Sequence, residues 1–203
     1  MKPRKGQLPI VVFTLLSVIA FGSYFIGKKD YEFIIYVGVI IFFALVFIIS
    51  NDKIYYPNGV LWGMAIWAFG HMAGGAIYLN SIRLYDIILI PISQNYPILR
   101  YDQFVHIIGF GAATVAIFYL LKPMLKNCTE HPIALSIIII CAGLGIGAFN
   151  EIAEAIVSAL VPQSGVGGYV NTSLDLIADI IGSILAYVII RLADKDFIVP
   201  SSG

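Results

Sequence analysis

The chain has 203 residues, of which 60% are hydrophobic and only 12% are charged. Because a soluble domain is usually about 25% charged, this composition excludes an ordinary soluble protein and indicates an integral membrane protein. Basic and acidic residues number 12 each, so the formal net charge is zero. The chain therefore lacks the basic excess typical of nucleic-acid-binding proteins. The expected partner is membrane lipid, and the sequence predicts no particular protein partner.

Six stretches are long and apolar enough to cross a bilayer, which takes about 20 mainly apolar residues. They are residues 8–26, 33–50, 60–79, 102–121, 133–160 and 173–192. The expected fold class is an all-α integral membrane protein, a six-transmembrane-helix bundle that forms one domain over residues 1–203. The segment Asn80–Tyr101 has charges and prolines around a short apolar run, which predicts a partly interfacial loop between the third and fourth helices.

An even number of spans puts both termini on the same side of the membrane. Cytoplasmic segments carry an excess of lysine and arginine. With the N-terminus inside, the inside segments hold eight such residues and the outside segments hold four. We therefore expect a multi-pass protein of the cell (inner or plasma) membrane with cytoplasmic N- and C-termini.

Two carboxylates, Glu151 and Glu154, lie three residues apart at the end of the fifth apolar stretch. An ionised carboxylate near the centre of a membrane helix costs about 2.5–3.5 kcal/mol on insertion scales. Residues with this cost are usually functional, so the pair predicts a polar site inside the bundle.

Two further helices carry polar pairs at the same depth. The fourth span begins outside with Asp102, and His106 follows one helical turn deeper. The sixth span also begins outside, with Asp175 and Asp179 one turn apart. Residues spaced i,i+3 or i,i+4 share a helix face. We therefore expect all three pairs at the outer leaflet, with His71 of the third span as a further candidate.

A group of five or six carboxylates cannot all ionise in a low dielectric without a counter-charge. A divalent metal would supply that charge, and carboxylates with imidazole suit Zn, Mn, Fe or Mg. We predict metal ligands at Asp102, His106, Glu151, Glu154, Asp175 and Asp179. Protonation of some carboxyls, for use in a transport cycle, is the other resolution.

Each member also has a structural interpretation. Asp102 can cap the fourth helix or pair with Arg100, and Thr172-Ser173-Leu174-Asp175 matches a capping box. His71, between glycines, fits a hydrogen-bonded packing histidine. The deeper residues favour a functional role, with interhelical hydrogen bonding as the alternative; they are His106, Glu151, Glu154 and Asp179.

The C-terminal half resembles the YjdF-like family of inner-membrane proteins, whose function is not established. The resemblance rests on Arg100-Tyr101-Asp102-x-x-x-His106, Phe149-x-Glu151-x-x-Glu154 and Asn171-Thr172-x-x-Asp175-x-x-x-Asp179-x-x-Gly182. A weaker similarity is to VanZ-like membrane proteins associated with glycopeptide resistance. The YjdF-like pattern has Asp and Trp where this chain has Asn171 and Ala155. The resemblance implies a six-helix bundle and a shared polar site, without a substrate.

Three functions fit these observations. The leading one is a metal-dependent enzyme acting on a lipid or lipid-linked substrate, because a metal can activate water while a carboxylate moves the proton. Glu151 or Glu154 would be the catalytic base, and the substrate-binding candidates are His71, Arg83, Arg100, Asn150 and Asn171. The alternatives are a proton- or cation-coupled small transporter and a structural membrane subunit.

Overall fold

The computed structural model of the protein describes residues 4–125, 131–161, 165 and 167–193. Within these residues the chain forms six α-helices. They are α1 (Leu8–Lys28), α2 (Tyr31–Ile54), α3 (Asn58–Ala76), α4 (Tyr101–Leu121), α5 (Pro132–Leu160) and α6 (Tyr169–Ala193). Between α3 and α4 lie a short hairpin, β1 (Tyr78–Leu79) and β2 (Ile82–Arg83), and the 3₁₀ turn η1 (Leu84–Asp86).

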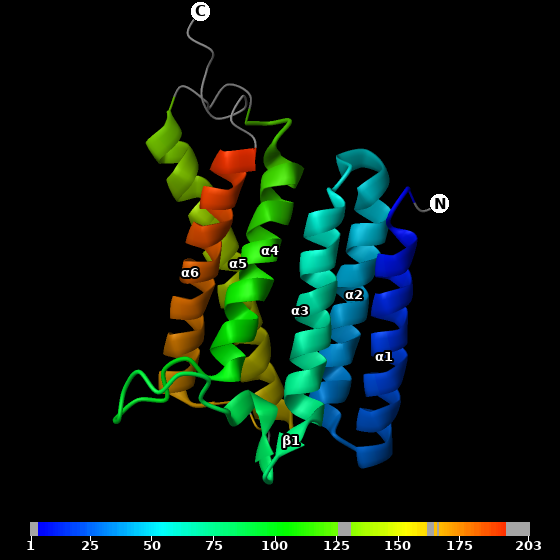
Figure 1. The fold of residues 1–203 in the computed structure, drawn as a ribbon, viewed down its shortest axis with the longest axis vertical. Coiled ribbons are helices and arrows are strands. Elements are labelled where there is room, and N and C mark those ends of the chain that lie inside the picture. The colour runs from blue at the N-terminus through cyan, green and yellow to red at the C-terminus, as the bar shows by residue number, and fades with distance from the viewer. Residues whose placement is uncertain (1–3, 126–130, 162–164, 166, 194–203) are drawn as a thin grey trace, which may run out of the picture.

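The helices form two groups of three that stand side by side (Figure 1). The helices α1, α2 and α3 form one group and α4, α5 and α6 the other, and α3 packs against α4 where the groups meet. The start of α1 and the end of α6 lie at one end of the bundle, while the hairpin and η1 lie at the opposite end. We call the latter the hairpin end.

Five of the described helices, α1, α2, α4, α5 and α6, are long and apolar enough to cross a membrane. This confirms the predicted helical membrane protein. The helix α3 is not among them, because its 19 residues include Asn58, His71 and several glycines that dilute its apolar character.

The third predicted span was too long at its C-terminus. The helix α3 ends at Ala76, and Ile77 is already extended. Residues 78–83 then form the hairpin, whose turn residues Asn80 and Ser81 have positive φ angles of 50° and 67°. A helix cannot pass through two left-handed residues, so the apolar stretch is divided at that point.

Helix α6 begins at Tyr169, four residues before the predicted start of that span. Asn171 and Thr172 are therefore helical residues, and the predicted capping box at Thr172 is wrong. Helix α2 also extends further than predicted and includes Asn51-Asp52-Lys53 in its last turn. In both cases the polar residues form an extra turn at the end of the helix, because the apolar turns next to them are already helical.

Small residues hold α4, α5 and α6 closely together. A Cβ atom added at Gly182 would meet the carbonyl oxygen of Ile107 and the backbone nitrogen of Gly111, so α4 and α6 cross with their backbones in contact. Gly147 of α5 lies directly against the carboxylate of Asp179. Glycine at such crossings lets helices approach closely in membranes, and here it lets three helices carry polar side chains to one place.

Candidate functional site: a buried histidine and carboxylate cluster

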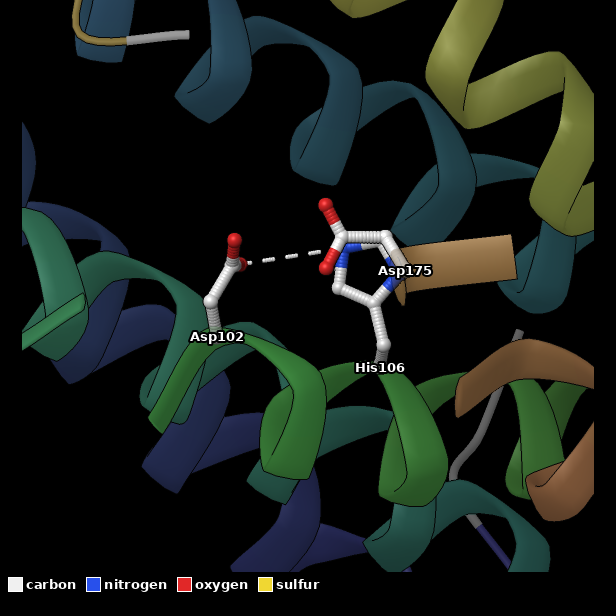
Figure 2. A group of neighbouring side chains, drawn as sticks. All are labelled: Asp102, His106 and Asp175. Atoms are coloured by element: carbon white, nitrogen blue, oxygen red, sulfur yellow. Dashed lines mark ion pairs between the residues drawn. The ribbon is translucent and has the colours of Figure 1, made fainter. Parts of the chain in front are cut away.

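His106, buried on α4, is the centre of a polar cluster near the hairpin end. Its Nδ1 atom lies 2.9 Å from Oδ1 of Asp179 on α6 and 3.9 Å from Oε1 of Glu151 on α5. Its Nε2 atom lies 3.8 Å from Oδ1 of Asp102, one turn earlier on α4. Figure 2 shows Asp102 and His106 on one helix, with Asp175 of α6 beside the imidazole.

The cluster contains two groups of possible metal ligands, and both include His106. Within each group, the possible ligand atoms all lie within 4.8 Å of one another. One group is Asp102, His106 and Asp175, and the other is His106, Glu151 and Asp179. Five of the six predicted metal ligands therefore lie close together in space, as their predicted common depth suggested. Their roles as ligands stay predictions.

The group around Asp102 and Asp175 is tied together by hydrogen bonds from amide side chains. The Nδ2 group of Asn171 donates to Oδ2 of Asp102 at 3.3 Å and to Oδ2 of Asp175 at 2.5 Å. The buried Gln103 donates through Nε2 to Oδ1 of Asp175 at 3.4 Å. The carboxylate oxygens that face Asn171 and Gln103 therefore already have donors.

The group around Glu151 and Asp179 is different. Both carboxylate oxygens of Glu151, and Oδ2 of Asp179, are buried without a hydrogen-bond partner among the described residues. The exposed fractions of Glu151 and Asp179 are 6% and 0%. A buried polar group without a partner is costly, so this side of His106 has free acceptor capacity that faces inward.

Glu154 lies outside both groups, although the sequence predicted it as a ligand. Its Oε1 accepts a hydrogen bond of 2.9 Å from Nδ2 of Asn150, one turn earlier on α5. Asn150 therefore orients Glu154 within the helix. The predicted catalytic role of Glu154 and the predicted substrate contact of Asn150 remain predictions.

His71 is buried on α3 and faces a tyrosine that the sequence analysis missed. The hydroxyl of Tyr85, on η1, lies 2.5 Å from Nδ1 of His71. The Tyr85 ring fills the space left by Gly74, because a Cβ there would meet its ring carbons. Burial raises the pKa of Tyr85 well above its usual value, and the charges of Asp102 and Glu154 raise it further. The phenol therefore stays protonated.

The two arginines predicted to meet a headgroup lie in different places. Arg83, on β2, pairs with Asp30 at 3.9 Å and lies over the ring of Phe33, so it belongs to the α1–α3 side. Arg100 precedes α4 at the edge of the cluster. It pairs with Asp86 at 3.5 Å and contacts Oδ1 of Asn171 at 3.5 Å.

The start of α4 is capped by a residue that the sequence analysis did not single out. Oε1 of Gln103 accepts a hydrogen bond of 2.7 Å from the backbone nitrogen of Arg100. Glutamine at the third helical position is a recognised signal for this cap. The suggestion that Asp102 caps α4 is therefore wrong, as is the suggestion that Asp175 belongs to a cap, since Asp175 is fully buried within α6.

Polar contacts continue beyond the cluster toward the middle of the bundle. Oγ of Ser183 donates to the carbonyl of Asp179 at 2.8 Å, and Oγ1 of Thr114 donates to Oγ of Ser183 at 3.0 Å. Thr114 is 12 residues after Asp102, about 18 Å along α4 at 1.5 Å per residue. Past it an apolar core closes the interface, formed by Phe118, Leu125, Leu135, Ile139, Tyr187 and Ile190.

The chain matches a known protein family over most of its length. A family described as "Predicted membrane protein (DUF2238)" matches residues 8–196. The chain belongs to this family. The match includes all six helices and the whole cluster, and it confirms membership of a membrane-protein family, while the resemblance to the YjdF-like and VanZ-like families remains a prediction. Neither the curated proteins nor the solved structures include a match.

Proposed function

We propose that the protein is a six-span membrane protein that binds a divalent cation inside its bundle. In this proposal α3 is the sixth span. Its 19 residues extend about 28 Å at 1.5 Å per residue, close to the hydrocarbon thickness of about 30 Å. It also runs along the bundle beside the other helices (Figure 1).

The proposed orientation has both termini on one side of the membrane. It is supported by the start of α1 and the end of α6, which lie at the same end of the bundle (Figure 1). The excess of basic residues on that side supports a cytoplasmic location. The hairpin end, with the segment 80–101, then lies at the outer interface.

The unpartnered oxygens of Glu151 and Asp179 carry the cation proposal. Nδ1 of His106 lies 3.9 Å from Oε1 of Glu151 and 2.9 Å from Oδ1 of Asp179, so one imidazole nitrogen and two carboxylates lie around one point. Donors at about 2.1 Å around a tetrahedral ion lie about 3.4 Å apart. The observed separations, all within 4.8 Å, would therefore shorten by up to about 1.4 Å when an ion binds. Two carboxylates and an imidazole suit Zn, Mn, Fe or Mg.

Asp102 and Asp175 would support this ion without holding it. A metal-bound histidine usually donates its other ring N–H to a carboxylate, which fixes the tautomer. With the ion at Nδ1, the proton of His106 moves to Nε2, which faces Asp102 at 3.8 Å. The amide bonds from Asn171 and Gln103 would keep these two carboxylates in place.

An enzymatic role would use the edge of the cluster. Asp102 retains a side-chain exposure of 18% there, and Arg100 lies next to it with an exposure of 27%. An anionic lipid headgroup would meet Arg100, the bound ion would activate a water molecule, and Glu154 would accept its proton. Neither the apolar groove beside α4 and α6 nor the one between α1, α2 and α3 is lined by a residue of the cluster, and in this proposal a substrate enters from the edge at Arg100.

The test is metal content, measured by elemental mass spectrometry on protein purified in detergent and loaded with each candidate ion. We expect about one ion per chain in the wild type and at least a tenfold loss in Glu151→Gln and His106→Ala. Thermal unfolding provides a second measurement, because bound ion stabilises the folded state by mass action.

A matched pair of glycine variants controls for folding. An alanine at Gly147 would displace the carboxylate of Asp179, whereas a Cβ at Gly145, on the same helix, has nothing within 4 Å. We expect Gly147→Ala to lose the ion and Gly145→Ala to keep it. A wild type that neither retains metal nor gains thermal stability from any candidate ion would overturn the proposal.

Cation transport is the second candidate, and the Thr114–Ser183 contact favours it. This contact extends the polar contacts from the cluster toward the bundle centre, and the apolar core around Phe118 closes the far side. Proteoliposomes loaded with a metal-sensitive dye would detect flux that is lost in Glu151→Gln. Metal binding without flux would leave a static site.

A further inference from the structure

A groove between α1, α2 and α3 is separate from the cluster and lies toward the opposite end of the bundle. It has a volume of about 440 Å³ and is lined almost entirely by apolar side chains, including Val11, Leu15, Ala44, Ile48 and Met64. Its polar lining, apart from Thr14, is Gln7, Asn51 and Asp52 at the end where α1 begins. The groove is therefore amphipathic along its length.

The groove exists because α2 packs over only half its length. The buried residues of α2 all lie between Glu32 and Ile40, and none lies between Ile41 and Ile54. The packed half contacts an aromatic core that includes Phe25, Phe33 and Tyr36. The other half leaves a gap toward α1 and α3, which membrane components can fill.

The length of the groove matches one leaflet. It extends along α2 from Asp52 to Ile40, which is 12 residues or about 18 Å at 1.5 Å per residue. Half of the hydrocarbon core is about 15 Å thick. One acyl chain from the leaflet on this side would therefore fill the groove from its polar end to its apolar end.

Three basic residues contact the polar end of the groove or lie next to it in sequence. Arg4 donates from Nη2 to the carbonyl of Asn51 at 3.3 Å. Lys5 directly follows Arg4 in the sequence, Lys53 lies two residues after Asn51, and both lysines are exposed. Asp52 is the acidic residue of the polar lining. Three cations against one carboxylate favour an anionic headgroup.

We propose that this groove binds one acyl chain of an anionic phospholipid, with the headgroup at Arg4, Lys5 and Lys53. The site does not depend on the cation in the His106 cluster. It would fix α1 and α2 against α3, and thereby complete the packing of the N-terminal half with a lipid.

The experiment uses the full chain in nanodiscs made with phosphatidylglycerol or phosphatidylcholine, together with native mass spectrometry of the detergent-purified protein. We expect one retained phosphatidylglycerol in the wild type and a higher unfolding temperature in phosphatidylglycerol than in phosphatidylcholine. Lys5→Gln with Lys53→Gln should weaken phosphatidylglycerol binding about 30-fold, at about 1 kcal/mol for each lysine near a membrane surface. Lys28→Gln with Lys29→Gln, the same charge change at the opposite end, should leave it unchanged.

A second pair of variants tests the acyl chain. Ala44→Trp fills the groove, while Ala20→Trp puts the same volume on an exposed part of α1 outside the groove lining. We expect Ala44→Trp to lose the retained lipid and to keep its metal content, and Ala20→Trp to keep both. Equal lipid retention in the two variants would overturn the proposal. A wild type that is dimeric and becomes monomeric in Ala44→Trp would also overturn it, because the occupant would then be a second copy of the chain.

Discussion

The two halves of the bundle solve the problem of packing in a membrane in different ways. Helices α4, α5 and α6 approach closely at glycines and bury His106, Glu151 and Asp179 between them. Helices α1, α2 and α3 rely on an aromatic core at one end and leave an apolar groove at the other. The close backbone contact between α4 and α6 thus lies in the half that carries the polar cluster, where the positions of the polar side chains must be fixed.

The largest expected effect comes from opening the close crossing of α4 and α6. Gly182→Ala places a methyl group against backbone atoms of Ile107 and Gly111, which cannot rotate away. Overpacking costs about 1–3 kcal/mol and occasionally more, and a backbone clash falls at the upper end. We expect a strong loss of folded protein, measured by size-exclusion chromatography and thermal unfolding.

The matched variant for this crossing is Gly38→Ala on α2, where an added Cβ has nothing within 4 Å. It should change the free energy of unfolding by less than about 0.5 kcal/mol. Equal losses of folded protein in Gly182→Ala and Gly38→Ala would mean that close backbone contact does not distinguish the two halves.

The aromatic core gives the next largest effect. Phe33 has an exposed fraction of 2% and stacks on Phe25 at a ring-centroid distance of 4.8 Å. Phe33→Ala should cost about 3 kcal/mol because it leaves a cavity. Elemental analysis of the folded fraction should still find the ion, since Phe33 belongs to the aromatic core of the other half. Loss of the ion would show that the halves are coupled.

A smaller effect is expected where the hairpin end joins the two halves. Tyr85→Phe removes the hydroxyl that bonds to His71 and leaves a buried ring nitrogen without that partner. Such a loss costs about 1–3 kcal/mol. Hydrogen exchange at residues 77–87 should speed up while exchange in α6 stays slow. Unchanged exchange at residues 77–87 would mean that Tyr85 does not anchor this segment.

The smallest expected effect concerns the polar contact between Thr114 and Ser183, beyond the cluster. Thr114→Val removes the bond to Ser183, and interhelical hydrogen bonds in membranes average about 0.6 kcal/mol. Ser136→Ala is the control, because within the described part of the chain the hydroxyl of Ser136 bonds to a carbonyl of its own helix, that of Ile133. If transport is the function, Thr114→Val should lower cation flux far more than stability. A variant with normal flux would assign the contact to packing alone.

The polar pairs of the cluster could be predicted because helical periodicity fixes which residues share a face. Asp102 and His106, or Asp175 and Asp179, stay together in any arrangement of the helices. The sequence predicts Glu154 as a ligand on the same grounds as Glu151, yet Glu154 lies outside both groups. Rotation of α5 about its axis decides between the two glutamates, and that rotation depends on the contact between Gly147 and Asp179.

Partners that come from outside a helix could not be predicted. Tyr85 reaches His71 because the hairpin turns back over Gly74, and no periodicity in residues 77–100 indicates that turn. Asn171 bonds to Asp102 only because α6 begins four residues earlier than expected. Such contacts join segments far apart in the chain, and hydropathy has no information about them.

The amino-acid sequence by itself determined the membrane class, the approximate bounds of the helices and the depth of each polar pair. These properties depend on local composition and on the rise of 1.5 Å per residue. Tertiary structure alone decided that His106 lies between a pair of carboxylates held by amide side chains and a pair with buried oxygens that have no partner among the described residues, and that α2 leaves a groove beside α1. Both depend on how helices rotate and tilt against one another, which is set by close packing at a few small residues.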